Sequence, residues 1–170
     1  MPKALVDTGA GPWVLRALDA LRGCDPLLVV VGARADEVAA LLPGDVVVVR
    51  NDGYQQGMGS SLACGLRAVP ALEPPADAVL VMLVDLPDVG RPVLDRLLAA
   101  AGPPEGARST LVRATYRGRP GHPVVLGRQH WAGVLAVATG DEGARRYLGH
   151  HRPVAIECGD LATGRDVDRP

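Results

Sequence analysis

The apolar positions of the chain form two kinds of segment, and these alternate along most of its length. Short apolar runs without helical spacing predict strands. Six segments have this pattern: Leu27–Val31, Asp45–Val49, Ala78–Val84, Ser109–Ala114, Val124–Leu126 and Val154–Cys158. Apolar residues that recur every three or four positions predict amphipathic helices. Six further segments have this spacing: Pro12–Arg22, Asp36–Leu42, Ser60–Val69, Arg91–Ala101, Gln129–Val137 and Glu142–Leu148.

The order of these segments predicts the fold class. Strands and helices alternate up to Ala101, which is typical of right-handed βαβ units in an open, mostly parallel sheet. We therefore expect a single α/β domain over residues 1–170, with three layers and helices on both faces of the sheet. Ligands of such sheets bind beyond the carboxyl ends of the strands. Three polar clusters are predicted there: Gly32–Ala33, Asn51–Gly59 and Asp85–Asp88.

Composition supports this fold and excludes some partners. The chain has two Trp, three Tyr and no Phe, so its core must be built from Val, Leu and Ala, which suit a covered parallel sheet. The 18 basic and 19 acidic residues give a net charge of −1. A broad field that attracts nucleic acid or an acidic membrane is therefore not expected.

The cysteines and the apolar runs indicate the compartment. The three cysteines are scattered and contain no Cys-x-x-Cys pair, which is typical of small buried side chains in a reducing cytoplasm. The chain has no signal segment, and its apolar runs are far shorter than the roughly 20 residues of a membrane helix. We expect a cytoplasmic protein without a membrane segment.

Lys3 is the only lysine, whereas the other seventeen basic residues are arginine. Because the ordinary solvent-exposed cations of this chain are arginines, the single lysine is a candidate for a specific function. Chance remains the alternative at this point.

The segment Asn51–Leu62 joins a predicted strand to a predicted helix and contains Gly57, Gly59, Ser60 and Ser61. Glycines let the backbone approach a ligand, and the amides and hydroxyls of a helix N-terminus form a donor-rich pocket for a base, ribose or phosphate. The alternative is a flexible turn with a serine cap.

Asp85 follows the strongest predicted strand, Ala78–Val84. A carboxylate at this position can hold Mg²⁺ on phosphate oxygens, because Mg²⁺ prefers one or two carboxylates together with phosphate and water. A turn-forming aspartate is the alternative, and Asp88 is interpreted as a turn or cap residue.

Three weaker candidates lie in the second half of the chain. His122 sits in the predicted tight turn Gly118–Pro123, where it is either functional or structural. Asp166 and Asp168 either bring a second carboxylate to the metal or belong to a frayed acidic tail. Arg145 and Arg146 are interpreted as a solvated helix face. Gly9–Val14 lacks the third glycine and the preceding strand of a dinucleotide fingerprint and is rejected.

Six motifs in order along the chain resemble the MobA-like nucleotidyltransferases, and the resemblance is nearest to the molybdenum cofactor cytidylyltransferases (MocA-like). The motifs are Pro2–Leu5, Asn51 with Gly57–Leu62, Val84–Pro87, Gly121–Pro123, Gly140–Arg145 and Asp166–Asp168. The resemblance spans essentially the whole chain. It implies a Rossmann-like sheet of the nucleotide-diphospho-sugar transferase type.

The resemblance also implies roles for single residues. Lys3 would neutralise the nucleotide phosphates, and Asp85 and Asp168, with Asp166 less securely, would bind the Mg²⁺ cofactor. His122 would lie on the acceptor side. The residues implied to contact the nucleotide are Asn51, Gly57, Met58, Gly59, Ser60 and Ser61.

The start of the chain departs from this family. Its members begin with a central strand and a loop of the form Leu-Ala-Ala-Gly-x-Ser-x-Arg-Met-Gly before Pro-Lys, whereas here Met1 directly precedes Pro2. We therefore expect an N-terminally truncated domain, the alternative being a genuine short protein that uses a partner's segment or has lost activity.

The expected reaction is transfer of CMP or GMP from CTP or GTP to a phosphorylated acceptor, molybdopterin cofactor, with release of pyrophosphate. A molybdoenzyme is an expected protein partner. Two alternatives stay open: a glycosyltransferase of the GT-A type, suggested by the acid-x-acid form of Asp166–Asp168, and an inactive nucleotide-binding or partner module.

Overall fold

The computed structural model describes residues 1–73 and 75–167. The chain forms two compact units. The first unit combines Met1–Asp25, Asp77–Arg128 and residues 153–167, and the second combines Pro26–Ala76 with Gln129–Arg152. Each unit contains a sheet and helices, so the predicted α/β class is confirmed.

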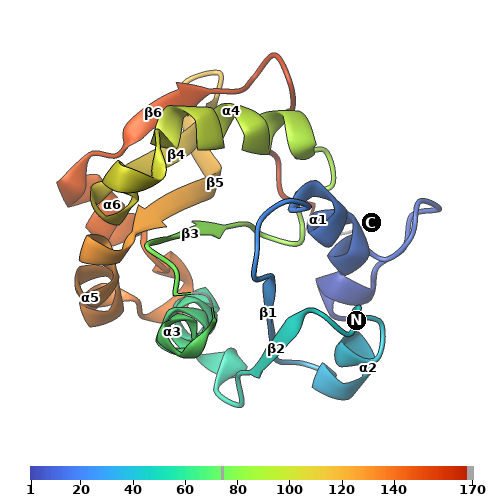
Figure 1. The fold of residues 1–170 in the computed structure, drawn as a ribbon. Coiled ribbons are helices and arrows are strands. Elements are labelled where there is room, and N and C mark those ends of the chain that lie inside the picture. The colour runs from blue at the N-terminus through green and yellow to red at the C-terminus, as the bar shows by residue number, and fades with distance from the viewer. Residues whose placement is uncertain (74, 168–170) are drawn as a thin grey trace. The chain divides into compact units, whose positions relative to one another are not determined.

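The sheet of the first unit has the strand order β3-β5-β4-β6 (Figure 1). Its strands are β3 (Ala78–Val81), β4 (Leu111–Tyr116), β5 (Arg119–Gly127) and β6 (Val154–Glu157). β5 runs antiparallel to both β3 and β4, whereas β6 pairs with β4 in parallel. The sheet of this unit is therefore mixed.

Helices and short 3-10 turns complete the first unit. The helix α4 (Arg91–Ala101) packs on β4, β5 and β6 through the buried Val93, Leu94 and Leu97. The other elements of this unit are η1 (Lys3–Leu5), α1 (Trp13–Ala20) and η4 (Pro104–Ser109).

A two-residue turn joins β4 to β5. Arg117 and Gly118 have φ of 52° and 76°, as the tightest hairpin turns require at both central positions. The Glu157 carboxylate holds the turn by accepting the Arg117 amide at 2.7 Å and the Gly118 amide at 3.0 Å. These backbone hydrogen bonds hold the pKa of Glu157 at about 2.

The second unit contains a parallel pair, β1 (Leu28–Val31) and β2 (Val47–Arg50), connected through α2 (Ala35–Ala39). The helix α3 (Met58–Ala68) packs on both strands. The remaining elements are η2 (Tyr54–Gln56), η3 (Val69–Ala71), α5 (Arg128–Val137), η5 (Gly140–Glu142) and α6 (Arg145–His151).

Two local predictions need correction. His122 lies within β5, not in a turn, because the turn closes already at Arg117–Gly118 and the strand starts at Arg119. Helix α3 starts at Met58 after Gly57, so Ser60 lies inside the first turn and is not the residue that caps it. The cause is the same in both cases: pairing and packing decided where the elements begin, and these are not visible in a local pattern.

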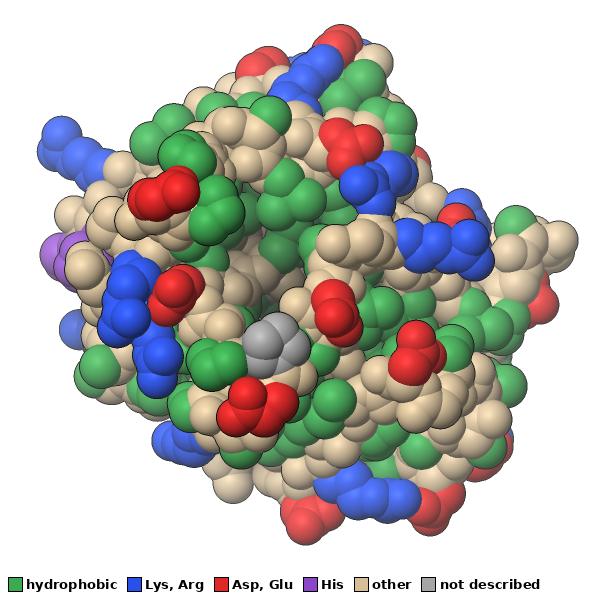
Figure 2. Space-filling model, in the orientation of Figure 1, with side chains coloured by type: hydrophobic (Ala, Val, Ile, Leu, Met, Phe, Trp, Pro, Cys, Tyr) green, Lys and Arg blue, Asp and Glu red, His purple; other side chains and the backbone are tan. Residues whose placement is uncertain are grey.

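On the face shown in Figure 2, acidic and basic side chains are interspersed. In the part of the chain that the structure describes, no helix is long and apolar enough to cross a membrane.

Candidate functional site

Lys3 and Asp85 form an ion pair in the first unit. The Lys3 Nζ donates to Asp85 Oδ2 at 2.7 Å, with 35% of the lysine side chain and 15% of the aspartate side chain exposed. Lys3 begins the turn η1, and Asp85 follows β3, which ends at Val81 and is thus shorter than predicted. The structure therefore brings together two residues that the sequence had singled out separately.

The second oxygen of Asp85 lacks a hydrogen-bond partner. Oδ1 is buried and has no hydrogen-bond partner among the described residues. Leaving such an acceptor unpaired costs about 1–3 kcal/mol, so an unpaired buried oxygen in a native protein calls for an explanation. A cation or a donor from a substrate would supply the missing partner.

The chain's last described stretch runs beside Asp85. The Val167 amide donates to the Asp85 carbonyl at 3.0 Å. Asp166, which is exposed, directly precedes Val167. Asp168, predicted as a second metal carboxylate, lies outside the described residues.

These groups fit a cation that is shared with phosphate. The residues that the structure describes contain no cluster of three or more His, Cys, Asp or Glu side chains able to hold a metal. Mg²⁺ needs no such cage, since it usually retains water and takes one or two carboxylates together with substrate phosphates. The unpaired Asp85 Oδ1 matches that requirement.

His122 is half-buried on β5 in the same unit. The pKa of His122 is lowered to about 4, mainly by burial and also by the Arg113 guanidinium, whereas the Asp85 carboxylate opposes both effects. Arg113 Nε donates to the Gly121 carbonyl at 3.0 Å, and the Tyr116 hydroxyl donates to the His122 carbonyl at 2.6 Å. At neutral pH the imidazole is therefore uncharged and can exchange hydrogen bonds with a substrate.

In the second unit, Asn51 organises the start of α3. Its buried side chain donates to the Ser60 hydroxyl at 2.9 Å and to the Ser61 hydroxyl at 3.0 Å, and it accepts the Gly53 amide at 3.0 Å. The Ser60 hydroxyl donates in turn to the Gly57 carbonyl at 2.8 Å. Four of the predicted nucleotide-binding residues, Asn51, Gly57, Ser60 and Ser61, thus belong to one hydrogen-bonded group.

Close packing explains why glycine stands at positions 57 and 59. A Cβ on Gly57 would lie 2.5 Å from the Gly140 carbonyl carbon, and a Cβ on Gly59 would lie 2.8 Å from the Thr139 backbone. Sequence reasoning attributed these glycines to a ligand, whereas the structure shows the chain's own segment around Gly140 against them. Met58, between them, is 42% exposed.

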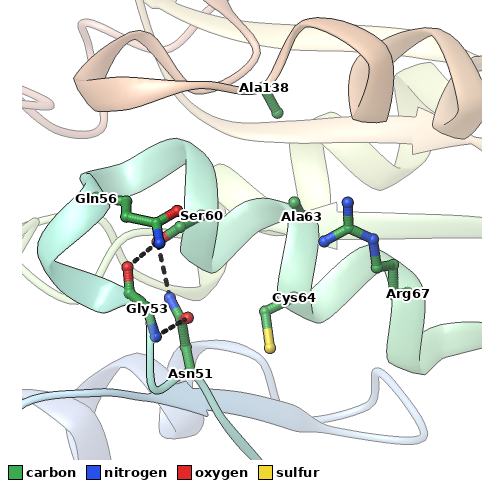
Figure 3. Close-up of a pocket in the computed structure, with 8 residues that line it drawn as sticks. All are labelled: Asn51, Gly53, Gln56, Ser60, Ala63, Cys64, Arg67 and Ala138. Atoms are coloured by element: carbon green, nitrogen blue, oxygen red, sulfur yellow. Dashed lines mark hydrogen bonds between the residues drawn. The ribbon is translucent and has the colours of Figure 1, made fainter.

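A pocket of about 320 Å³ lies along α3 within the second unit (Figure 3). Its lining residues are Asn51, Gly53, Gln56, Ser60, Ala63, Cys64, Arg67 and Ala138. Sequence reasoning missed Ala63, Cys64, Arg67 and Ala138 as site residues. A signal was present, because Ser60, Cys64 and Arg67 recur at helical spacing and so share one face of the helix.

The fold and these polar groups define a nucleotide-binding α/β protein, and the family follows from comparison. The chain belongs to the family of the MobA-like NTP transferase domain, whose model matches residues 1–154. It is therefore an enzyme of the nucleotidyltransferase class whose substrate is a nucleoside triphosphate.

Relatives of known name or structure agree with the family assignment. Nicotine blue oxidoreductase of Paenarthrobacter nicotinovorans is 34% identical over 98% of this chain and 83% of its own length. The crystal structure of an Rv0371c homologue from Mycobacterium sp. strain JC1 matches with a TM-score of 0.79 and 26% identity, covering 99% of this chain and 82% of that one. Rv0371c of Mycobacterium tuberculosis H37Rv, solved as a complex with manganese, matches with a TM-score of 0.73 and 26% identity, covering 99% and 87%.

Proposed function

We propose that this protein transfers CMP or GMP from CTP or GTP to a phosphorylated acceptor, molybdopterin cofactor, and releases pyrophosphate. The observation that carries the proposal is the Lys3–Asp85 pair, in which one carboxylate oxygen is held by the ammonium and the other is buried and unpaired. Such a pair offers a positive charge and a cation ligand side by side, and transfer between phosphates needs both.

In this reaction the protein positions the phosphates and stabilises charge, and it forms no covalent bond to the substrate. A phosphate oxygen of the acceptor attacks the α-phosphorus of the nucleotide, a new P–O bond forms, and the bond to pyrophosphate breaks. Lys3 donates to phosphate oxygens and offsets the charge that develops on the leaving pyrophosphate. A divalent cation such as Mg²⁺, when bound, supplies further charge neutralisation and aligns the phosphates.

Asp85 would hold the cation, and its Oδ2 orients Lys3. Asp168 would be a second ligand, with Asp166 in a lesser role. Support for this comes from the amide of Val167, which lies between these two residues in the sequence and donates to the Asp85 carbonyl. His122, neutral at physiological pH, would contact the acceptor.

Nucleotide contacts are assigned to Asn51 and to Gly57, Met58, Gly59, Ser60 and Ser61. The Ser60 hydroxyl already donates to the Gly57 carbonyl, so it would contact the nucleotide as an acceptor. The Ser61 hydroxyl accepts from Asn51 and keeps its own proton for a ligand. The first amides of α3 point toward the same end of the helix and favour an anion.

Pyrophosphate release tests this proposal directly. Purified protein is incubated with CTP or GTP, Mg²⁺ or Mn²⁺, and molybdopterin cofactor, and pyrophosphate and the nucleotide-linked cofactor are quantified. Pyrophosphate formation that requires both acceptor and divalent cation is expected. Release of a nucleoside diphosphate from a nucleotide sugar would indicate a glycosyltransferase instead, and nucleotide binding without turnover would indicate an inactive module.

A second candidate is supported by one observation, the 34% identity to a protein named nicotine blue oxidoreductase. Under this alternative the chain acts as an oxidoreductase on nicotine blue. The visible absorbance of nicotine blue, followed with and without an added reductant, tests it. A change that needs the protein and no nucleoside triphosphate favours this alternative over nucleotidyl transfer.

A further inference from the structure

The pocket along α3 has features that nucleotidyl transfer does not use. Figure 3 shows Arg67 at one end, the group of Asn51, Gly53, Gln56 and Ser60 at the other, and Ala63 and Cys64 between them. Its volume of about 320 Å³ lies at the lower end of the range for small-molecule sites.

Arg67 is the only side chain with a fixed charge among those that line this pocket. Within residues 1–73 and 75–167 its guanidinium makes no ion pair and no hydrogen bond, whereas Arg34 and Arg50 of the same unit are paired with Glu37 and Asp36. A guanidinium is a planar fork of donors that matches the geometry of carboxylate and phosphate. The pocket therefore favours an oxyanion at this end.

The opposite end offers one available polar group. The amide of Asn51 is already used in its bonds to Ser60, Ser61 and Gly53. The side-chain amide of Gln56 makes no hydrogen bond within the described part of the chain, and it can both donate and accept. Ala63 and Ala138 give the space between the two ends an apolar lining, together with the Cys64 sulfur.

We propose that this pocket, which shares Asn51 and Ser60 with the loop assigned to the nucleotide, binds a small molecule with an oxyanion group, phosphate or carboxylate. The oxyanion binds the Arg67 guanidinium, a short apolar body lies along Ala63 and Ala138, and a second polar group bonds to the Gln56 amide. This site goes beyond the proposed nucleotidyl transfer, in which Arg67 and Gln56 have no role.

Cys64 provides a reporter inside the pocket. It is half-buried there, and its Sγ donates to the Arg50 carbonyl at 3.4 Å. Cys24 is also half-buried but lies in the other unit, so it serves as an internal control, and Cys158 is fully buried. The alkylation rate of each cysteine by iodoacetamide is measured by peptide mass spectrometry, without nucleotide and at constant ionic strength.

Inorganic phosphate and acetate are titrated separately as probes of the two oxyanion sources. We expect one of them to slow alkylation of Cys64 by about threefold when its concentration is twice its dissociation constant, because only the free pocket reacts. The rate at Cys24 stays unchanged. The anion with the stronger effect identifies the source of the oxyanion.

Two matched variants test the role of the guanidinium. Arg67→Gln abolishes the protection of Cys64, whereas Arg119→Gln, which removes the same charge from an exposed hairpin residue, retains it. The proposal is overturned if neither anion slows Cys64, if Cys24 is slowed equally, or if protection survives in Arg67→Gln. Arg67→Lys keeps the charge and is expected to weaken the protection of Cys64, so it replaces Arg67→Gln if that variant does not fold.

The titration of the wild-type protein tests the proposal without any variant. Because no turnover is measured, the result does not depend on whether the proposed nucleotidyl transfer is correct.

Discussion

The ammonium of Lys3 donates to Oδ2 of Asp85 at 2.7 Å, across 82 positions of the chain. Lys3 is the first residue of the 3-10 turn η1, and Asp85 follows the strand β3. The other oxygen of Asp85 is buried without a partner among the described residues, and we propose that a cation binds there.

Asp85→Asn removes the negative charge while keeping the shape of the side chain. We expect pyrophosphate formation to fall by about 10²-fold or more, since a preorganised electrostatic contact to the reacting phosphates is lost. The far-UV circular dichroism spectrum stays unchanged. Asp95→Asn, at an exposed residue paired with Arg91, is the control and keeps its activity. An Asp85→Asn protein with normal divalent-dependent turnover removes Asp85 from the proposed role.

Lys3→Met and Lys3→Arg separate the charge of the lysine from its shape. Lys3→Met loses the charge that faces the phosphates, so kcat/KM for the nucleotide is expected to fall by about 10²-fold. Lys3→Arg keeps the charge but replaces a compact ammonium by a planar fork, and is expected to recover only part of the activity. Steady-state kinetics with varied nucleotide measures both. Equal activity of the wild type and Lys3→Met contradicts the assignment.

Asn51→Ala leaves two serine hydroxyls and the Gly53 amide without their common partner. The side chain is only 7% exposed, so the orphaned groups stay largely away from water. The free energy of unfolding is expected to fall by about 1–3 kcal/mol, measured by urea denaturation. Asn51→Asp still accepts the Gly53 amide but cannot donate to the serines, and it should fall between the wild type and Asn51→Ala. A loss below the error of the measurement would show that the network does not stabilise the loop.

Gly57→Ala and Gly102→Ala form a matched pair. Both glycines have backbone angles that other residues avoid, with φ/ψ of 97°/179° and 80°/−170°. A Cβ on Gly102 meets nothing within 4 Å, whereas a Cβ on Gly57 would lie 2.6 Å from Asp141 Oδ1 and still closer to Gly140. We expect Gly57→Ala to lose about 1–3 kcal/mol more than Gly102→Ala in urea denaturation. Equal losses would mean that backbone strain alone explains Gly57.

His122 predicts a pH dependence of stability with a defined sign. Its pKa is about 4 in the folded protein and about 6.5 in the unfolded chain, so the unfolded state binds the proton first as pH falls. The contribution of His122 to the free energy of unfolding is present above about pH 6.5 and is lost as pH falls toward 4. It falls by about 2 kcal/mol between pH 7 and pH 5. The variant His122→Gln should show a correspondingly smaller fall in the free energy of unfolding over that range, measured by urea denaturation at both pH values. The same slope in both proteins contradicts the role of His122.

Local pattern by itself determined the fold class and most of the elements. The helix α4 has the predicted bounds Arg91–Ala101, because an amphipathic stripe with a proline in its first turn specifies a helix within one segment. The apolar run Leu27–Val31 was equally informative and became β1, Leu28–Val31. Residue types and order alone also marked two candidates, Lys3 as the only lysine and Asp85 as a carboxylate directly after a predicted strand.

Tertiary structure alone decided strand direction, extent and partners. An apolar run has the same pattern in a parallel and an antiparallel sheet, so β5 could not be predicted to run antiparallel to β3 and β4 or to include His122. The contact of Lys3 with Asp85 depends on chain segments 82 positions apart. Likewise, Gly57 lies against Gly140, 83 positions further along the chain. Such distant contacts follow from the packing within each unit, and a local hydrophobic period contains no information about them.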